Sequence, residues 1–421
     1  MEQGSATPLL ESMLQRTGSK LLTLGNIIVS LVGTGVLGLP FAFRIAGWLA
    51  GSLGVTIVGL TTYYCMLLVV MCREKLASEG SSAEAKTYGD LAYRISGITG
   101  RYLTEILILL SQCGGAVSYI LFIGQNLQSV FQGSGFTFKS YVFLLVPIEI
   151  GLSWIGSLPA LAPSSIFADV CNFLAMGIVV KEDIEQAMRD KFSYEQRTAI
   201  TSDIKKLPFA GGMAVFCFEG FALTLALESS MQDRAAFPRL LALAFCGTTI
   251  LYFLFGLCGY MAYGDETRDI VTLNLPKTWT SSTVKVGLCL GLVFTFPTMI
   301  HPVNEIVEGK LERFKWFKKY LHANDDNDHS TRLRKIGTYV SRAILVAGLA
   351  VVAMYVPAFG VFASLVGSTV SALIAFVLPA TFHLKLFGSS LLLWQKALDF
   401  ILVFVGSVFA VYGTYSTIVG V

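Results

Sequence analysis

Two carboxylates stand inside an apolar stretch of this chain that is long enough to cross a membrane. Glu219, followed by Gly220, lies near the middle of residues 209–230, and Glu228 lies further along the same stretch. An ionisable group at mid-membrane depth is costly, and by default it marks a transport pathway or a proton relay. We therefore expect Glu219 to take up a proton on one side of a membrane and release it on the other. The alternative is that its carboxylate only caps or braces a broken helix.

Glu228 has a different expected role. In a helix it would lie about 13 Å along the axis from Glu219, so the two carboxylates cannot serve the same end of a substrate. We expect Glu228 to belong to a gate or an ion pair, and we keep it with His301 as a second candidate for proton coupling. His301 and Glu305 stand four residues apart, which suits either a proton relay or an interfacial anchor pair.

Residues 103–131 carry one polar face. Members of this face recur at spacings of three and four, and they are Gln112, Gly115, Tyr119, Phe122 and Asn126. On a helix they could line a cavity, with Tyr119 stacking on or hydrogen bonding to a substrate, and packing through polar side chains is the alternative. Thr295, in the apolar run 284–306, is a candidate for the same cavity or for a cation site.

A run of glycines interrupts the first apolar stretch, residues 22–43. Gly33, Gly35 and Gly38 precede Pro40, and each glycine weakens a helix. Hydrocarbon offers no water to loose N–H and C=O groups, so irregular backbone survives only where it lines a polar cavity or is buried in protein. A broken membrane helix therefore predicts a substrate site. The competing interpretation is close packing of small residues against another helix.

The composition is that of an integral membrane protein. Hydrophobic residues make up 54% of the chain and charged residues only 14%, whereas soluble domains carry about 25% charged residues. The eight cysteines form no CxxC pair and no Cys/His cluster, which predicts buried apolar side chains and neither disulfides nor a zinc site. No HExxH or GxSxG motif occurs, so we expect no enzyme, no metal and no cofactor, and the net charge of +3 indicates no nucleic-acid partner.

Apolar runs of about 20 residues predict an all-α membrane protein with eleven transmembrane helices. Their expected ranges are 22–43, 47–72, 103–131, 140–157, 163–180, 209–230, 238–262, 284–306, 337–356, 358–384 and 391–418. Lys and Arg are more numerous in the connections that share a side with the N-terminus. The positive-inside rule therefore predicts that residues 1–21 are a cytosolic tail.

The spans divide into two halves of five, residues 22–180 and 209–385, followed by a last span in 386–421. Because five is odd, the second half would enter the membrane with the opposite orientation. The interrupted first and sixth spans then correspond, which is the pattern of an inverted repeat with a site between two discontinuous helices. The connection 181–208 carries apolar residues at helical spacing, which predicts a short amphipathic helix on the non-cytosolic surface; they are Ile184, Ala187, Met188 and Phe192.

Such a site suits a zwitterionic amino acid. Half-helix N-termini present free N–H groups and a positive dipole end to a carboxylate, and carbonyls at half-helix C-termini suit an ammonium group or a cation. We expect the backbone of 33–36 to meet the carboxylate and the carbonyls of 218–221 to meet the amine. The candidate substrate-binding residues are Ser30, Gly33, Thr34, Gly35, Val36, Tyr119, Phe218, Glu219, Gly220, Phe221 and Thr295.

Several stretches of the sequence resemble the amino acid/auxin permease family, and within it the vacuolar and proton-coupled neutral amino acid transporters. They are Gly25 to Arg44 with Ala46 to Trp48, Phe122 to Leu127, Phe218 to Gly220, Leu227 with Glu228, Thr295 to Pro302, and Leu378 to Leu384. The resemblance implies a LeuT-type fold with a 5+5 inverted repeat and broken helices 1 and 6, and secondary transport of amino acids, often with protons. One departure is Ala226, where relatives commonly have proline, and it leaves side-chain selectivity open.

These observations predict secondary active transport of neutral amino acids by alternating access. The expected partners are the amino acid, a proton and the lipid bilayer, with symport toward the cytosol across a vacuolar or lysosomal membrane. Two alternatives stay open. Sodium could replace the proton, with oxygens of Ser30, Val32 and Thr295 as its ligands, or the chain could be an amino acid sensor with a transporter fold.

Overall fold

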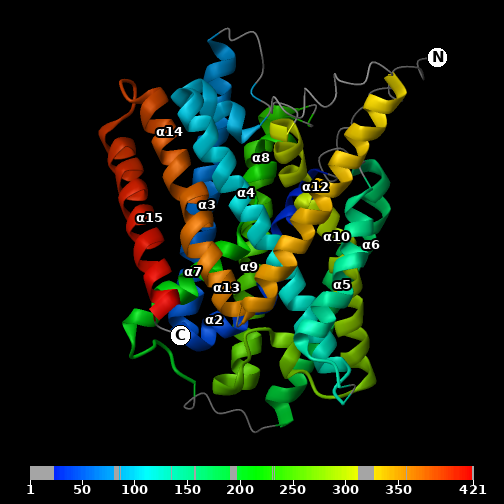
Figure 1. Ribbon diagram of the computed structural model, residues 1–421. Helices are drawn as coiled ribbons and strands as arrows, with labels where there is room; N and C mark the ends of the chain where they lie inside the picture. The colour runs from blue at the N-terminus through cyan, green and yellow to red at the C-terminus, as the bar shows by residue number, and fades with distance from the viewer. Residues whose placement is uncertain are drawn as a thin grey trace, which may run out of the picture. The chain divides into compact units, whose positions relative to one another are not determined.

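The structure is a computed structural model, and it describes residues 23–79, 85, 87–133, 135–155, 158–189, 197–229, 231, 233–311, 327–356 and 358–419. Within these residues the chain forms helices and no strand (Figure 1). The expected tail, 1–21, and Phe192 lie outside them. After the helix Thr23–Leu31, the elements are η1 (Thr34–Gly38), α2 (Leu39–Ala46), α3 (Trp48–Ser78), α4 (Tyr88–Val130), α5 (Phe138–Ser153), α6 (Leu158–Arg189), η3 (Ile204–Lys206), α7 (Leu207–Cys217), α8 (Phe221–Ser229), η4 (Arg234–Ala236), α9 (Phe237–Tyr263), η5 (Gly264–Glu266), η6 (Val271–Asn274), α10 (Trp279–Leu311), α12 (Asn327–Tyr355), α13 (Phe359–Val366), η7 (Gly367–Ser371), η8 (Leu373–Val377), α14 (Leu378–Phe387) and α15 (Leu393–Val419).

Seven described helices are long and apolar enough to cross a membrane, or eight if the bent pair Thr23–Leu31 and Thr34–Ala46 counts as one span. The other segments predicted to span include α5, α7 and α8, which have 16, 11 and 9 residues. Each is too short by itself for about 30 Å of hydrocarbon. The seven or eight long apolar helices make the chain a multi-pass helical membrane protein.

The chain forms two compact units, and each is described by itself. The first unit consists of Met1–Ile108, Thr198–Leu257 and Ser364–Val421, and the second of Leu109–Arg197 and Cys258–Ala363. The first unit contains both interrupted stretches that the sequence singles out. The second contains most of the polar face expected on residues 103–131.

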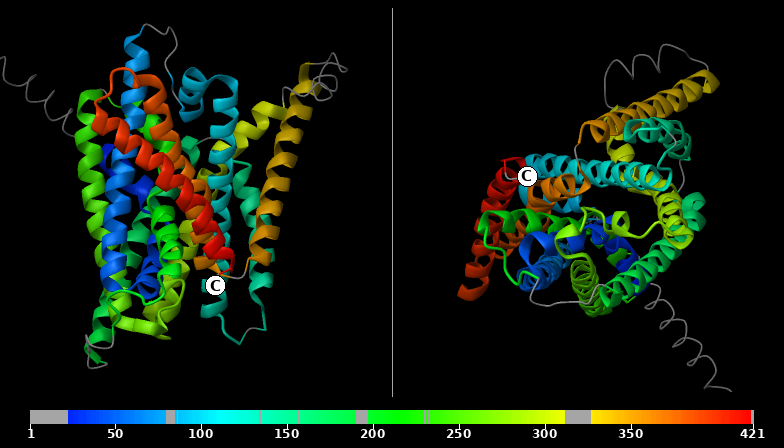
Figure 2. Two further views of the ribbon diagram at one scale, coloured as in Figure 1. Left: turned by 90° about the vertical axis from the view of Figure 1, so that its left-hand side faces the viewer. Right: turned by 90° about the horizontal axis from the view of Figure 1, so that it is seen from below.

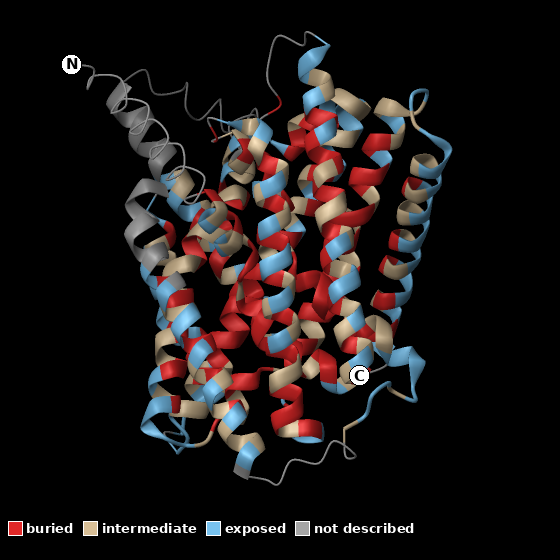
Figure 3. Cartoon of the chain, turned by 180° about the vertical axis from the view of Figure 1, so that it is seen from behind, coloured by how far each residue is buried: buried red, intermediate tan, exposed pale blue. Residues whose placement is uncertain are grey.

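In the first unit, α14 and α15 lie side by side (Figure 2). His383 Nδ1 and Asp399 Oδ2 are 2.6 Å apart between these helices, and both residues are buried. Few of the other residues of α15 are buried (Figure 3), as expected for a helix that faces lipid. A carboxylate buried on such a helix needs a partner, so the His383–Asp399 pair ties α15 to α14.

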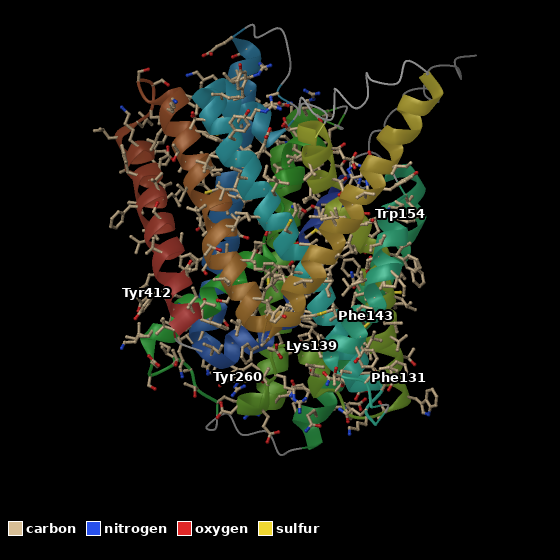
Figure 4. The ribbon with its side chains drawn as sticks, viewed as in Figure 1. Phe131, Lys139, Phe143, Trp154, Tyr260 and Tyr412 are labelled. Carbon is tan, nitrogen blue, oxygen red and sulfur yellow. The ribbon has the colours of Figure 1, made fainter. Side chains whose placement is uncertain are left out.

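In the second unit, α6 packs on α10 and α5 packs on α12. Buried Arg342 of α12 donates to Glu308 Oε1 at 2.8 Å and to the Ser153 carbonyl at 2.8 Å, which joins α12 to both α10 and the end of α5. Trp154, just after the end of α5, donates its indole N–H to the Tyr339 carbonyl, and Phe143, in the first half of α5, is exposed (Figure 4). The exposed aromatic rings suit a surface in contact with lipid.

Helix α6 does not end at residue 180, the predicted end of the fifth span. It continues to Arg189, so residues 181–189 are the last turns of α6, and the separate amphipathic helix expected there does not form over these residues. Ile184 and Met188 are exposed, and Asp183 is buried instead. Apolar spacing alone could not show this, because the same period of 3.6 residues fits a new helix and an extension of the preceding one.

Candidate functional site

The first interruption lies between Leu31 and Thr34. The two helices on either side are bent by 43°, and Gly33 between them has an extended backbone with φ −112° and ψ −163°. The chain resumes as the short 3₁₀ helix η1, and no side chain caps its start. Pro40 stands in the first turn of α2, where a helix has no use for the missing N–H. Free backbone N–H groups thus follow Gly33 within an apolar segment.

The second interruption lies between α7 and α8. Helix α7 ends at Cys217, residues Phe218, Glu219 and Gly220 connect, and α8 begins at Phe221. The Gly220 carbonyl accepts from the Leu223 N–H at 3.2 Å and from the Thr224 hydroxyl at 3.1 Å, which starts α8. The carbonyls of Phe218 and Glu219 lie in the gap between the two helices.

The two interruptions touch each other inside the first unit. A Cβ added to Gly35 would lie 2.9 Å from Cys217 Sγ and 3.1 Å from Cys217 Cα, closer than real side chains pack. A Cβ on Gly33, by contrast, would meet no atom within 4 Å. Gly35 is therefore a packing glycine, as the packing interpretation expects, whereas Gly33 has open space beside it, and a substrate at that position stays a prediction.

Tyr252 of α9 forms hydrogen bonds to both interruptions. Its hydroxyl lies 2.6 Å from the Leu31 carbonyl and 3.1 Å from the Cys217 carbonyl, so one proton serves both helix ends. Tyr252 is fully buried, and its ring packs on Phe218 with a centroid distance of 4.9 Å. Carbonyls at helix ends lack intrahelical partners, and a buried hydroxyl is a means of satisfying them without water.

Glu219 also has a partner in this unit. Ser371, the last residue of η7, is buried and donates its hydroxyl to Glu219 Oε2 at 2.8 Å. Neither Ser371 nor Tyr252 is among the candidates predicted from the sequence. Each stands more than 30 residues from the atoms it contacts, and a hydroxyl in an apolar helix is by itself no sign of a partner.

Glu228 forms a buried ion pair with Arg73 of α3. Both side chains are at most 6% exposed. This geometry matches the ion-pair role considered for Glu228. Its role in proton coupling stays a prediction.

The remaining candidates have local contacts. Ser30 donates to the Ile27 carbonyl at 2.7 Å, while Thr34, Val36 and Phe221 are buried near the interruptions. Three candidates belong to the second unit: Tyr119 is buried in α4, Thr295 donates to the Gly291 carbonyl at 2.8 Å, and His301 Nδ1 lies 3.9 Å from Glu305 Oε1.

The expected polar face of 103–131 serves packing at two positions in the second unit. Asn126 accepts from the Thr272 hydroxyl at 2.7 Å and donates to the Phe122 carbonyl at 2.9 Å. At Gly115, an added Cβ would overlap Met299 Cε.

All eight cysteines are free thiols.

Comparison with known proteins places the chain. Residues 16–419 match the family described as "Transmembrane amino acid transporter protein". The chain is 59% identical to amino acid transporter ANT1 of Arabidopsis thaliana, over 99% of this chain and 97% of the relative. It is 38% identical to amino acid transporter AVT3B of the same plant, over 99% of this chain and 98% of the relative. Among solved structures, MhsT in complex with L-phenylalanine has a similar fold, with a TM-score of 0.52 at 13% identity, covering 94% of this chain and 98% of that one.

Proposed function

The chain belongs to the transmembrane amino acid transporter family, and on that premise we propose that it carries neutral amino acids across a membrane by alternating access, in symport with protons toward the cytosol. Membership of the family makes it a transporter and not an enzyme. The substrate class, the coupling ion and the direction are the parts that we propose.

The contact between the two interruptions is the observation that carries this proposal. Backbone N–H groups after Gly33 and carbonyls at Phe218 and Glu219 are brought together by the Gly35–Cys217 contact. Because Tyr252 already occupies the Leu31 and Cys217 carbonyls, the two carbonyls in the second gap are the ones left for an ammonium group. A carboxylate at the first gap and an amine at the second would fit an amino acid backbone.

The membrane arrangement that we propose has eleven spans in a LeuT-type 5+5 inverted repeat. The first repeat covers residues 22–180, the second covers 209–385, and the last span lies in 386–421, with the N-terminus in the cytosol. A vacuolar or lysosomal location supplies an acidic far side. Each unit of pH difference then provides about 1.4 kcal/mol per proton, which is enough to concentrate a substrate tenfold.

Uptake into proteoliposomes tests the proposal. The purified chain is reconstituted and assayed by counterflow with radiolabelled alanine, leucine, phenylalanine and glutamine, and then by net uptake under an imposed pH or sodium gradient. We expect exchange of at least one of them and accumulation driven by pH alone. Accumulation driven by sodium at equal pH would overturn proton coupling, and a lack of exchange for every amino acid would favour the sensor.

The variant Glu219→Gln tests whether Glu219 carries the coupled proton. Glutamine has the size and hydrogen-bonding capacity of glutamic acid but cannot exchange a proton, so we expect the ratio of pH-driven accumulation to exchange to fall at least tenfold. A proportional loss of both activities, together with loss of the monodisperse peak in size-exclusion chromatography, would assign Glu219 to bracing the helix.

A further inference from the structure

The middle of the tenth apolar stretch is not α-helical. Helix α13 ends at Val366, and the chain continues through two π-helical runs, η7 (Gly367–Ser371) and η8 (Leu373–Val377), before α14 begins. The π-helix is rare, usually a single turn, and frequent at functional sites. Two runs in succession within one membrane segment therefore call for a cause.

Close backbone contact holds η7 against α7. A Cβ added to Gly212 would lie 2.5 Å from the Ser364 carbonyl oxygen, and one added to Gly367 would overlap the Gly212 carbonyl. Ser364 donates to the Phe209 carbonyl at 2.9 Å. With both glycines at the contact, the two backbones meet directly, and η7 follows α7 toward the second interruption.

Four hydroxyls stand between residues 364 and 371, and they are used differently. Ser364 bonds to the backbone of α7, and Ser368 and Thr369 donate to the carbonyls one turn earlier in their own helix, at 2.7 Å and 2.5 Å. Such bonds back to the preceding turn loosen a helix. Ser371 instead donates to Glu219 Oε2 at 2.8 Å. Of these four hydroxyls, that of Ser371 is the one that donates to a carboxylate.

The surroundings of Glu219 make this bond decisive. The titratable groups that are neutral when protonated, on elements packed around the second interruption, are thiols and phenols. Those of Cys65, Cys72, Cys217, Tyr88 and Tyr252 are buried, and those of Tyr63 and Tyr64 of α3 are partly exposed. Of the charged groups on these elements, Arg73 and Glu228 pair with each other at the far end of α8, about 13 Å along the axis, and Asp399 of α15 pairs with His383 of α14. Others are Arg44 of α2, Glu74 and Lys75 near the end of α3, Lys385 of α14 and Lys396 of α15. The side-chain hydrogen bond that Glu219 accepts in the described part of this unit comes from a neutral hydroxyl, that of Ser371.

We propose that Ser371 is a positioning residue for proton binding at Glu219 and that the π-helical stretch Gly367–Val377 is the element that responds to it. When Glu219 is ionised, it accepts the Ser371 proton and holds η7 at the second interruption. When Glu219 binds a proton, its carboxyl O–H becomes a donor to Ser371 Oγ, and the Ser371 proton turns to another acceptor. Charge-assisted bonds are about twice as strong as neutral ones, so protonation weakens the tie between η7 and the interruption. This inference rests on the proposed proton coupling.

The variant Ser371→Ala removes the donor, and Ser371→Thr keeps it. Because a hydroxyl that donates to a carboxylate favours its charged form, its removal lets the protonated form persist to higher pH. We expect the midpoint of pH-driven uptake, measured at constant pH difference with the best of the four radiolabelled amino acids, to rise by about one pH unit in Ser371→Ala, and Ser371→Thr to restore it.

Ser368→Ala is the matched control, since it removes a hydroxyl three residues away that donates only within its own helix. It should leave the midpoint in place. An unchanged midpoint in Ser371→Ala, or an equal rise in both alanine variants, would overturn the role of Ser371. If Ser371→Ala does not fold, Ser371→Cys, a weaker donor of similar size, should give a smaller rise, and its absence would count equally against the role. A wild-type chain that exchanges substrate but shows no pH-driven uptake would instead refute the proposed proton coupling.

Discussion

Two glycines two residues apart should respond in opposite ways to the same methyl group. At Gly35 an alanine Cβ would lie 2.9 Å from Cys217 Sγ, 3.1 Å from Cys217 Cα and 3.2 Å from Phe216 Cδ1. The thiol can turn away, but the backbone atom cannot move without shifting α7. Overpacking of this kind costs about 1–3 kcal/mol, so Gly35→Ala should lower the thermal midpoint by several degrees.

Gly33→Ala is the matched control for stability and the test for substrate. No atom lies within 4 Å of the added Cβ, and the backbone at Gly33 is open to other residues. We expect wild-type thermal stability but a rise of about tenfold in the KM for the transported amino acid, since a methyl group would stand where a substrate backbone approaches.

The assay for both variants is a melting curve in detergent, read by size-exclusion chromatography after heating at a fixed rate, together with uptake in proteoliposomes. A Gly35→Ala chain that melts like the wild type would refute the stability prediction, because the contact between the interruptions would then be able to yield. An unchanged KM in Gly33→Ala would refute the substrate prediction, because the open space beside Gly33 would then not be the substrate path.

Two further predictions concern one acidic residue in each unit, Glu228 in the first and Asp269 in the second. Glu228→Gln leaves the Arg73 guanidinium buried without its ion-pair carboxylate, which costs about 3–5 kcal/mol. The monodisperse fraction in size-exclusion chromatography should therefore fall sharply, and replacing both residues by methionine should recover part of it. Equal losses in the single and double variants would contradict this prediction. Asp269, between η5 and η6, accepts the Gly360 N–H at the start of α13, and burial raises its pKa above its ordinary value, although the backbone donors oppose the shift. An acid with a raised pKa stabilises the fold below its unfolded-state pKa and loses that contribution as pH rises through the folded-state value. The melting temperature should therefore be higher at acidic pH, and Asp269→Asn should reduce the dependence of melting temperature on pH. The same pH dependence in the variant and the wild type would refute this prediction.

The positions of the two interruptions could be predicted from the sequence, because hydrogen-bond accounting in hydrocarbon is local. Three glycines and a proline in one apolar run, and a carboxylate beside a glycine in another, are visible without any fold. Their partners could not be predicted. Tyr252 and Ser371 reach the interruptions from 35 and 152 residues away, and nothing in an isolated Tyr or Ser within an apolar helix distinguishes a donor to a helix end from a packing residue.

Whether a substitution at a glycine should affect stability or transport depends on whether other atoms lie against that glycine. Gly35, Gly212 and Gly367 each allow one backbone to touch another, and an added Cβ at any of them would clash. Changes there should act on stability first and on transport only as a result. Gly33 faces open space and Ser371 contributes a single hydrogen bond, so changes there should alter transport while the fold persists. The first interruption therefore contains one residue that packs against the second interruption, Gly35, and one, Gly33, whose open side we propose for the substrate.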